Sequence, residues 1–63
     1  HRTVLIECLT EQLADEMIHV PGVRSLIEKR IADRYFTVSE INAKPLMRLL
    51  QERGYEPAAK QLS

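Results

Sequence analysis

The sequence predicts an all-α domain, a compact bundle of three main helices, and three observations support this prediction. Apolar residues recur every three to four positions along most of the 63-residue chain, as on one face of an amphipathic helix. Pro21-Gly22 and Gly54 end two of these stretches. The hydrophobic share, 44%, can supply one small core. We therefore expect a single helical domain over residues 1–63.

The first predicted helix covers residues 3–20. Thr3 is placed to cap its first turn, and acidic residues occupy the face opposite the apolar one. Pro21 disfavours helical geometry at the residue before it, so the helix should end there. The apolar stripe consists of Val4, Leu5, Ile6, Leu9, Leu13, Met17 and Val20.

The second predicted helix covers residues 23–36 and is followed by a short polar corner at 37–40. Its charged residues lie away from the apolar face, as on a helix that packs one side against a core. Ser39 is placed to cap the next helix. The apolar face consists of Val23, Leu26, Ile27, Ile31 and Tyr35.

The third predicted helix follows the corner and ends at Gly54, which can adopt a positive φ at the position after the cap. Pro45 leaves two alternatives, because proline inside a helix removes one backbone hydrogen bond. Either the helix is kinked at Pro45, or a separate turn at 39–43 precedes a main helix over 45–53, with Pro45 at its first position. The second alternative is favoured. Residues 56–63 could add a short C-terminal helix.

Five residues of the predicted stripes are expected to be the most buried side chains of this bundle. They are Leu9, Leu13, Ile27, Ile31 and Leu50.

Charge and cysteine content bound the class of protein. The net charge is zero, but residues 1–23 hold one base and four acids, whereas residues 24–63 hold eight bases and five acids. A basic half of this kind can face an anionic partner. The single cysteine, Cys8, excludes an internal disulfide and indicates a reducing compartment. No apolar run is long enough to span a membrane. We expect a cytoplasmic, intracellular domain, which could be excised from a longer protein because its first residue is His1.

The stretch RYFTVSEINAKPLMRLLQERGY resembles the helix-turn-helix of bacterial winged-helix regulators of the gluconate-repressor type. The resemblance covers about residues 24–55, with 24–35 as the scaffold helix. Phe36, Thr37, Val38 and Ser39 match the corner. The matching end of the recognition helix is Arg48, Leu49, Leu50, Glu52, Arg53, Gly54 and Tyr55.

This resemblance implies transcription regulation through duplex DNA binding by the third helix. The start of a recognition helix enters the major groove, where Glu40, Asn42 and Lys44 would reach base edges. Basic side chains at 34, 44 and 48, with those at 29 and 30, would contact phosphates. The expected DNA-binding set is Glu40, Asn42, Lys44, Arg48, Arg34, Lys29 and Arg30.

The alternative is a protein–protein interaction or dimerisation module. Apolar residues of the first helix recur at heptad spacing, so this face could pair with a partner helix or with a second copy. The closing segment also resembles the LisH dimerisation motif in a few residues. The expected partner-binding stripe is Ile6, Leu13, Met17 and Val20.

No catalytic, cofactor or metal site is expected. Catalysis requires side chains that converge, whereas His1 is terminal and His19 lies at a predicted helix end. Cys8 and His19 would be about 16 Å apart along one helix, too far to share a metal ion. The glycines form no phosphate-binding loop. We therefore expect a non-catalytic macromolecular-binding domain without a small-molecule substrate.

Overall fold

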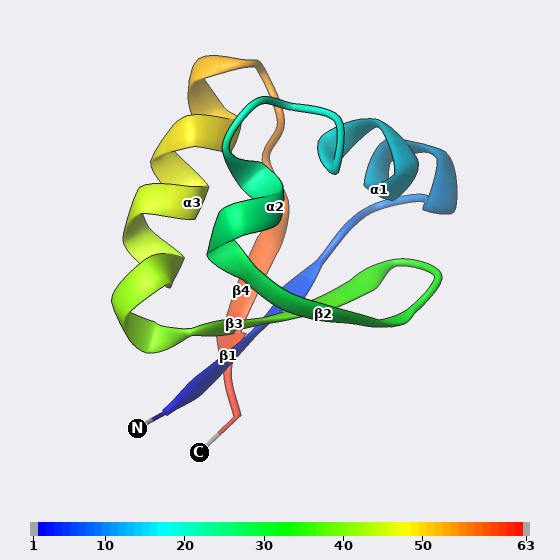
Figure 1. Ribbon diagram of the computed structural model, residues 1–63. Helices are drawn as coiled ribbons and strands as arrows, with labels where there is room; N and C mark the ends of the chain where they lie inside the picture. The colour runs from blue at the N-terminus through cyan, green and yellow to red at the C-terminus, as the bar shows by residue number, and fades with distance from the viewer. Residues whose placement is uncertain (1, 63) are drawn as a thin grey trace.

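The computed structural model describes residues 2–62 and shows an antiparallel four-stranded sheet with helices packed on it (Figure 1). The prediction of an all-α bundle is therefore wrong, and the fold is mixed α and β. The elements in chain order are β1 (Thr3–Glu7), α1 (Glu11–Met17), α2 (Val23–Leu26), β2 (Ile27–Ala32), β3 (Tyr35–Ser39), α3 (Glu40–Glu52) and β4 (Ala58–Gln61).

The strand order in the sheet is β2-β3-β1-β4, and each neighbouring pair is antiparallel. With helices between β1 and β2 and between β3 and β4, this is the ferredoxin-like β-α-β-β-α-β arrangement. Buried side chains of β1 and β3 cluster with those of α1, α2 and α3, so the helices cover one face of the sheet. No element of residues 2–62 covers the other face, which we call the open face.

Residues 3–7 form a central strand, where the sequence predicts the first turns of a helix over 3–20. Burial alternates along it, with Val4 and Ile6 in the core and the side chains between them half-buried. This period of two is that of a strand. Threonine, valine and isoleucine also favour an extended backbone.

The first helix begins only at Glu11. Thr10, not Thr3, is its N-cap: the Thr10 hydroxyl accepts a hydrogen bond from the backbone N–H of Leu13 at 3.1 Å. The predicted 18-residue helix is thus a strand, a connection and the two-turn helix α1.

The predicted helix over 23–36 is also wrong. It consists of a single helical turn, α2, followed by the hairpin of β2 and β3. The run YFTVS of β3 combines aromatic and β-branched residues, which pack well in a sheet. The residues of the predicted corner, 37–40, end β3 and begin α3, so the helix-turn-helix geometry is not formed.

The third helix is confirmed, with Ser39 as its N-cap, and it runs without interruption through Pro45. The separate turn favoured by the sequence is therefore wrong. Pro45 is exposed, so the carbonyl that it leaves unpaired can bond to water. The predicted glycine end is confirmed: Gly54 has φ +88°, and the N–H of Tyr55 bonds to the Leu50 carbonyl at 2.9 Å.

The C-terminal segment forms β4, where the sequence predicts a short helix over 56–63. β4 pairs with β1 along four residues without a register shift. Ser63 lies outside the described residues.

The core lies between the sheet and the helices. Of the five residues predicted to be most buried, only Leu50 is fully buried; Leu13 and Ile27 are half-buried, and Leu9 and Ile31 are 80% and 48% exposed. Ile31 is exposed because a strand places residues on the core face by a period of two, and Leu9 is exposed because it lies in the connection between β1 and α1. The largest fully buried side chains are Phe36, Ile6, Leu46, Leu50, Val23 and Val38.

Candidate functional site

The predicted DNA-binding residues of α3 divide into two groups. Lys44 and Arg48 are exposed one turn apart, and neither forms an ion pair with another described residue. Glu40 and Asn42 are engaged within the fold. The Glu40 carboxylate accepts a bond from the Gln61 amide at 3.0 Å, and the Asn42 amide donates to the carbonyl that ends α2 at 3.4 Å. Lys44 and Arg48 therefore differ from Glu40 and Asn42 in having no such contact within the described residues.

The remaining predicted basic residues do not extend that pair into one surface. Lys29 lies on the open face of β2, opposite Thr37. The Arg30 guanidinium lies 2.8 Å from the Asp15 carboxylate and stacks over the Phe36 ring, 5.4 Å from its centroid, on the helix-covered side. These residues therefore lie on opposite sides of the sheet, and Arg30 has a structural role.

Arg34 is also a structural residue. Its guanidinium donates to the carbonyls of Cys8 and Leu9, each at 3.2 Å, and so joins the turn before β3 to the end of β1. The other terminal nitrogen of the Arg34 guanidinium donates to the Tyr35 hydroxyl. This hydroxyl donates to the Glu7 carboxylate at 3.3 Å.

The predicted partner-binding stripe is not exposed on one helix. Ile6 lies in β1, and with Met17 and Val20 it belongs to the buried core. Leu13 is half-buried. These four residues are therefore not available together to a partner helix.

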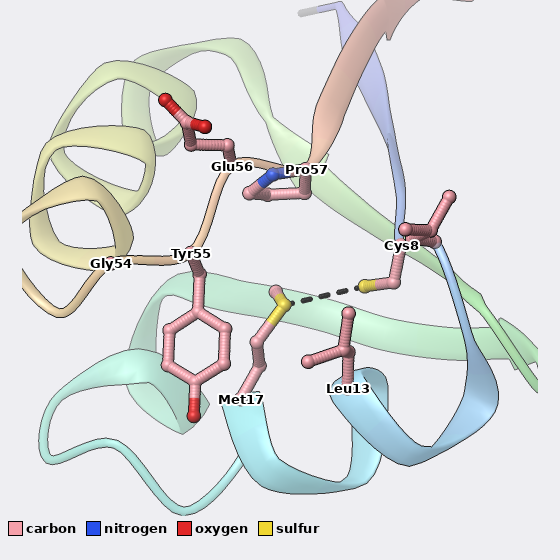
Figure 2. A pocket seen from close by; sticks show the side chains of 8 residues that line it. Cys8, Leu13, Met17, Gly54, Tyr55, Glu56 and Pro57 are labelled. Carbon is pink, nitrogen blue, oxygen red and sulfur yellow. Dashed lines mark hydrogen bonds between the residues drawn. The ribbon is translucent and has the colours of Figure 1, made fainter.

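A pocket of about 250 Å³ lies where β1 ends, between α1 and the connection from α3 to β4 (Figure 2). Leu13 and Met17 form its wall on α1, while Tyr55 and Pro57 face them from the connection. The Tyr55 hydroxyl lies at the rim and donates to Glu16 at 3.2 Å. The lining suits an apolar side chain.

Cys8 lies at the base of this pocket, with its Sγ 3.3 Å from the Met17 Sδ. Burial raises the pKa of Cys8 above its ordinary value of 9.0, although Arg30 and Arg34 act in the opposite direction. The group is therefore a protonated thiol at neutral pH, which is a weak nucleophile.

The outer edge of β4 is open, and two hydrogen bonds define its geometry. The N–H of Leu62 donates to the Thr3 carbonyl at 2.9 Å, and the N–H of Glu40 donates to the Arg2 carbonyl at 3.0 Å. Hydrogen-bonded and non-bonded pairs alternate along an antiparallel ladder. The odd-numbered residues of β1 therefore bond to β4, and the even-numbered ones to β3. It follows that Ala59 and Gln61 direct their N–H and C=O groups to the outer edge.

The two edges of the sheet differ in regularity. The ladder of β2 has two register shifts, between Ile27 and Lys29 and between Arg30 and Ala32. Such bulges bend an edge and hinder pairing with another chain. β4 has no shift, all four of its residues are exposed, and no strand of residues 2–62 pairs with its outer edge.

Two charged residues flank this edge. The Lys60 ammonium lies 3.6 Å from the Glu7 carboxylate on the neighbouring strand and remains 67% exposed. Glu56, four residues earlier, is exposed. The run AAKQ carries no alternating apolar pattern, so the sequence contained no indication of this strand or its edge.

No family model, curated protein or solved structure matches the chain. Within residues 2–62, no helix is long and apolar enough to cross a membrane. The same residues contain no group of three or more His, Cys, Asp or Glu side chains placed to hold a metal ion. The functional argument therefore depends on the surfaces described above.

Proposed function

We propose that the chain is a non-catalytic protein-interaction domain that binds an extended partner strand at the outer edge of β4. The observation that supports this proposal is the contrast between the two sheet edges: β2 is bulged, whereas β4 is regular and exposed. An open edge offers a row of main-chain donors and acceptors to a partner strand. A reducing compartment such as the cytoplasm fits the lone, buried Cys8 thiol.

The chemistry of the edge suits strand addition. Ala59 and Gln61 supply outward N–H and C=O groups, which a neighbouring backbone in the plane of the sheet can pair with. A partner segment that continued past Pro57 would reach the apolar pocket beside Tyr55. In strand addition, main-chain hydrogen bonds supply affinity, and such pockets supply specificity.

The test is hydrogen exchange of the Ala59 and Gln61 amides, measured by NMR with short alternating Val-Thr peptides of positive, zero and negative charge. At least one peptide should protect both amides. Ala59→Pro should abolish this protection, because it removes an outward donor while leaving the ladder to β1 intact. Ala59→Ser, which keeps the N–H, is the matched control.

A thermal melt must accompany these measurements. Where Ala59→Pro does not fold, Gln61→Pro removes the other outward donor and serves instead. Two results together overturn the proposal. With every peptide at roughly 1 mM, the Ala59 and Gln61 amides exchange as fast as in an unstructured chain. They also exchange at this rate in the protein alone, at concentrations up to roughly 1 mM.

A second candidate function is nucleic-acid binding by the exposed face of α3. The observation that favours it is that Lys44 and Arg48 lie one turn apart without an ion-pair partner among the described residues. Phosphates attract such a pair in a salt-dependent manner. Arg48→Ala should weaken duplex binding for all sequences alike and lower the salt slope by about one. Absence of binding at about 50 mM salt would refute this candidate.

A further inference from the structure

We infer that the partner strand at this edge is β4 of a second copy of the chain, paired antiparallel about a two-fold axis at Ala59. This inference depends on the proposed use of the β4 edge and specifies its occupant. The result is a continuous eight-stranded sheet with the helices of both copies on the same side. A two-fold axis requires the edge to be complementary to itself, and the hydrogen bonds and the charges of β4 satisfy this condition.

The hydrogen-bonding groups match at this register. Ala59 faces Ala59 of the second copy, and each can donate to the carbonyl of the other. Gln61 faces Pro57 of the second copy, and the Gln61 N–H donates to the proline carbonyl. Proline has no N–H, so it leaves no donor unsatisfied at this end of the interface.

The charges match as well. Glu56 lies diagonally across from Lys60 of the second copy, within reach of two long side chains, and the two Lys60 residues meet once at the same diagonal offset, so two attractive contacts oppose one repulsive contact. The symmetry creates this ion pair twice. A register centred on Lys60 would instead oppose two ammonium groups. A register centred on Ala58 would place Ala59 opposite Pro57 of the second copy. Because proline has no N–H, each such pair has one main-chain donor, whereas a pair of two Ala59 residues has two.

The difference between the β2 edge and the β4 edge limits the assembly to two copies. The bulges of β2 hinder a second strand from pairing there, so association through β4 stops at two copies and does not continue into a fibre. A single strand edge is a small interface, well below the ~1,200 Å² of a standard protein complex. We expect a dissociation constant on the order of 0.1 mM.

The experiment uses two charge reversals that oppose like charges across the axis. Glu56→Lys and Lys60→Glu should each weaken the dimer roughly ten-fold in sedimentation velocity, because both symmetry-related ion pairs become repulsive. An equimolar mixture of the two variants should dimerise at least as well as wild type. In the mixed dimer one chain carries lysine at both positions and the other carries glutamate at both, so each contact across the axis is again an ion pair.

Matched controls exclude a general effect of net charge. Glu52→Lys and Lys44→Glu make the same charge changes on the exposed face of α3. Alone or mixed, they should leave the dissociation constant within about two-fold of wild type. Thermal melts identify any loss of fold, since Lys60 also pairs with Glu7 within one chain.

The outcomes separate this inference from the proposed function. If the wild type is monomeric up to about 1 mM and a peptide still protects the Ala59 and Gln61 amides, the inference of a second copy is overturned. The proposed function then still holds. If the wild type is monomeric and no peptide protects these amides, both the inferred dimer and the proposed function are overturned. A dimer that survives Ala59→Pro, or that the mixture fails to restore, overturns pairing through β4.

Discussion

Truncation of Ile6 and of Leu9 gives opposite results for a strand and for a helix over the first residues of the chain. Ile6 is fully buried in the central strand, whereas Leu9 is 80% exposed. Ile6→Ala removes about three buried carbons at ~0.8 kcal/mol each and leaves a cavity, so we expect a loss of about 3–4 kcal/mol. Leu9→Ala should change stability by less than about 0.5 kcal/mol.

This loss is large for a domain of this size. At roughly 0.05–0.15 kcal/mol per residue, 63 residues give a total stability of about 3–9 kcal/mol. Ile6→Ala should therefore lower the melting temperature by about 15–25 °C. Ile6→Val, which removes one methyl group, should cost about 0.5–1.5 kcal/mol and keeps the comparison measurable if the alanine variant is unfolded.

The assay is urea denaturation followed by far-UV circular dichroism at constant pH and salt. The reasoning is refuted if Leu9→Ala destabilises the chain more than Ile6→Ala does. That order would place Leu9 in the core, as the helix over 3–20 requires.

Three further predictions concern a cap, a turn and the buried thiol. Thr10→Ala should cost about 1 kcal/mol in the same assay, because α1 loses its N-cap, and Thr10→Ser should restore most of it. Gly22→Ala should cost more than Gly54→Ala in thermal melts: both glycines have positive φ, but only at Gly22 would the new Cβ approach Leu49, to 3.3 Å. The raised pKa of Cys8 means that the unfolded thiol ionises first, so stability should fall as pH rises above about 9, and Cys8→Ala should remove that component. Iodoacetamide should react with Cys8 faster in urea than in the folded chain.

The sequence predicted α3 with its cap and its glycine end, because these features are local. Ser39 bonds within one turn, and Gly54 adopts a conformation that other residues rarely reach. Pro45 misled the prediction about the start of the helix. Its exposed position permits water to replace the missing hydrogen bond, which sequence spacing cannot show.

The strands were missed for different reasons. In residues 3–7 a period of two is present at Val4 and Ile6, but Leu5 and Leu9 add an accidental helical spacing, and short apolar runs are ambiguous. The β propensity of YFTVS was present in the sequence and was outweighed by the resemblance to a corner. β4 had no local pattern at all: AAKQ is a strand because β1 offers it a ladder.

Several of the predicted DNA-binding residues make contacts within the fold that the sequence did not indicate. Arg30, Arg34 and Asn42 are polar residues that the fold uses for its own contacts, and only the tertiary structure shows those contacts. Lys44 and Arg48 were correctly expected to be exposed, because their helix was correctly predicted. Their role in DNA binding stays a prediction.

The central position of β1 has a consequence for folding during synthesis. β1 is made first among the strands, yet its two neighbours, β3 and β4, come from the middle and the end of the described chain. The edge of β1 that pairs with β4 therefore stays unpaired until the ribosome has released the chain as far as Gln61. Pairings between distant segments form slowly compared with helical contacts, and unpaired strands aggregate. A chain interrupted before β4 should thus be an aggregation-prone species, with β1 as its exposed template.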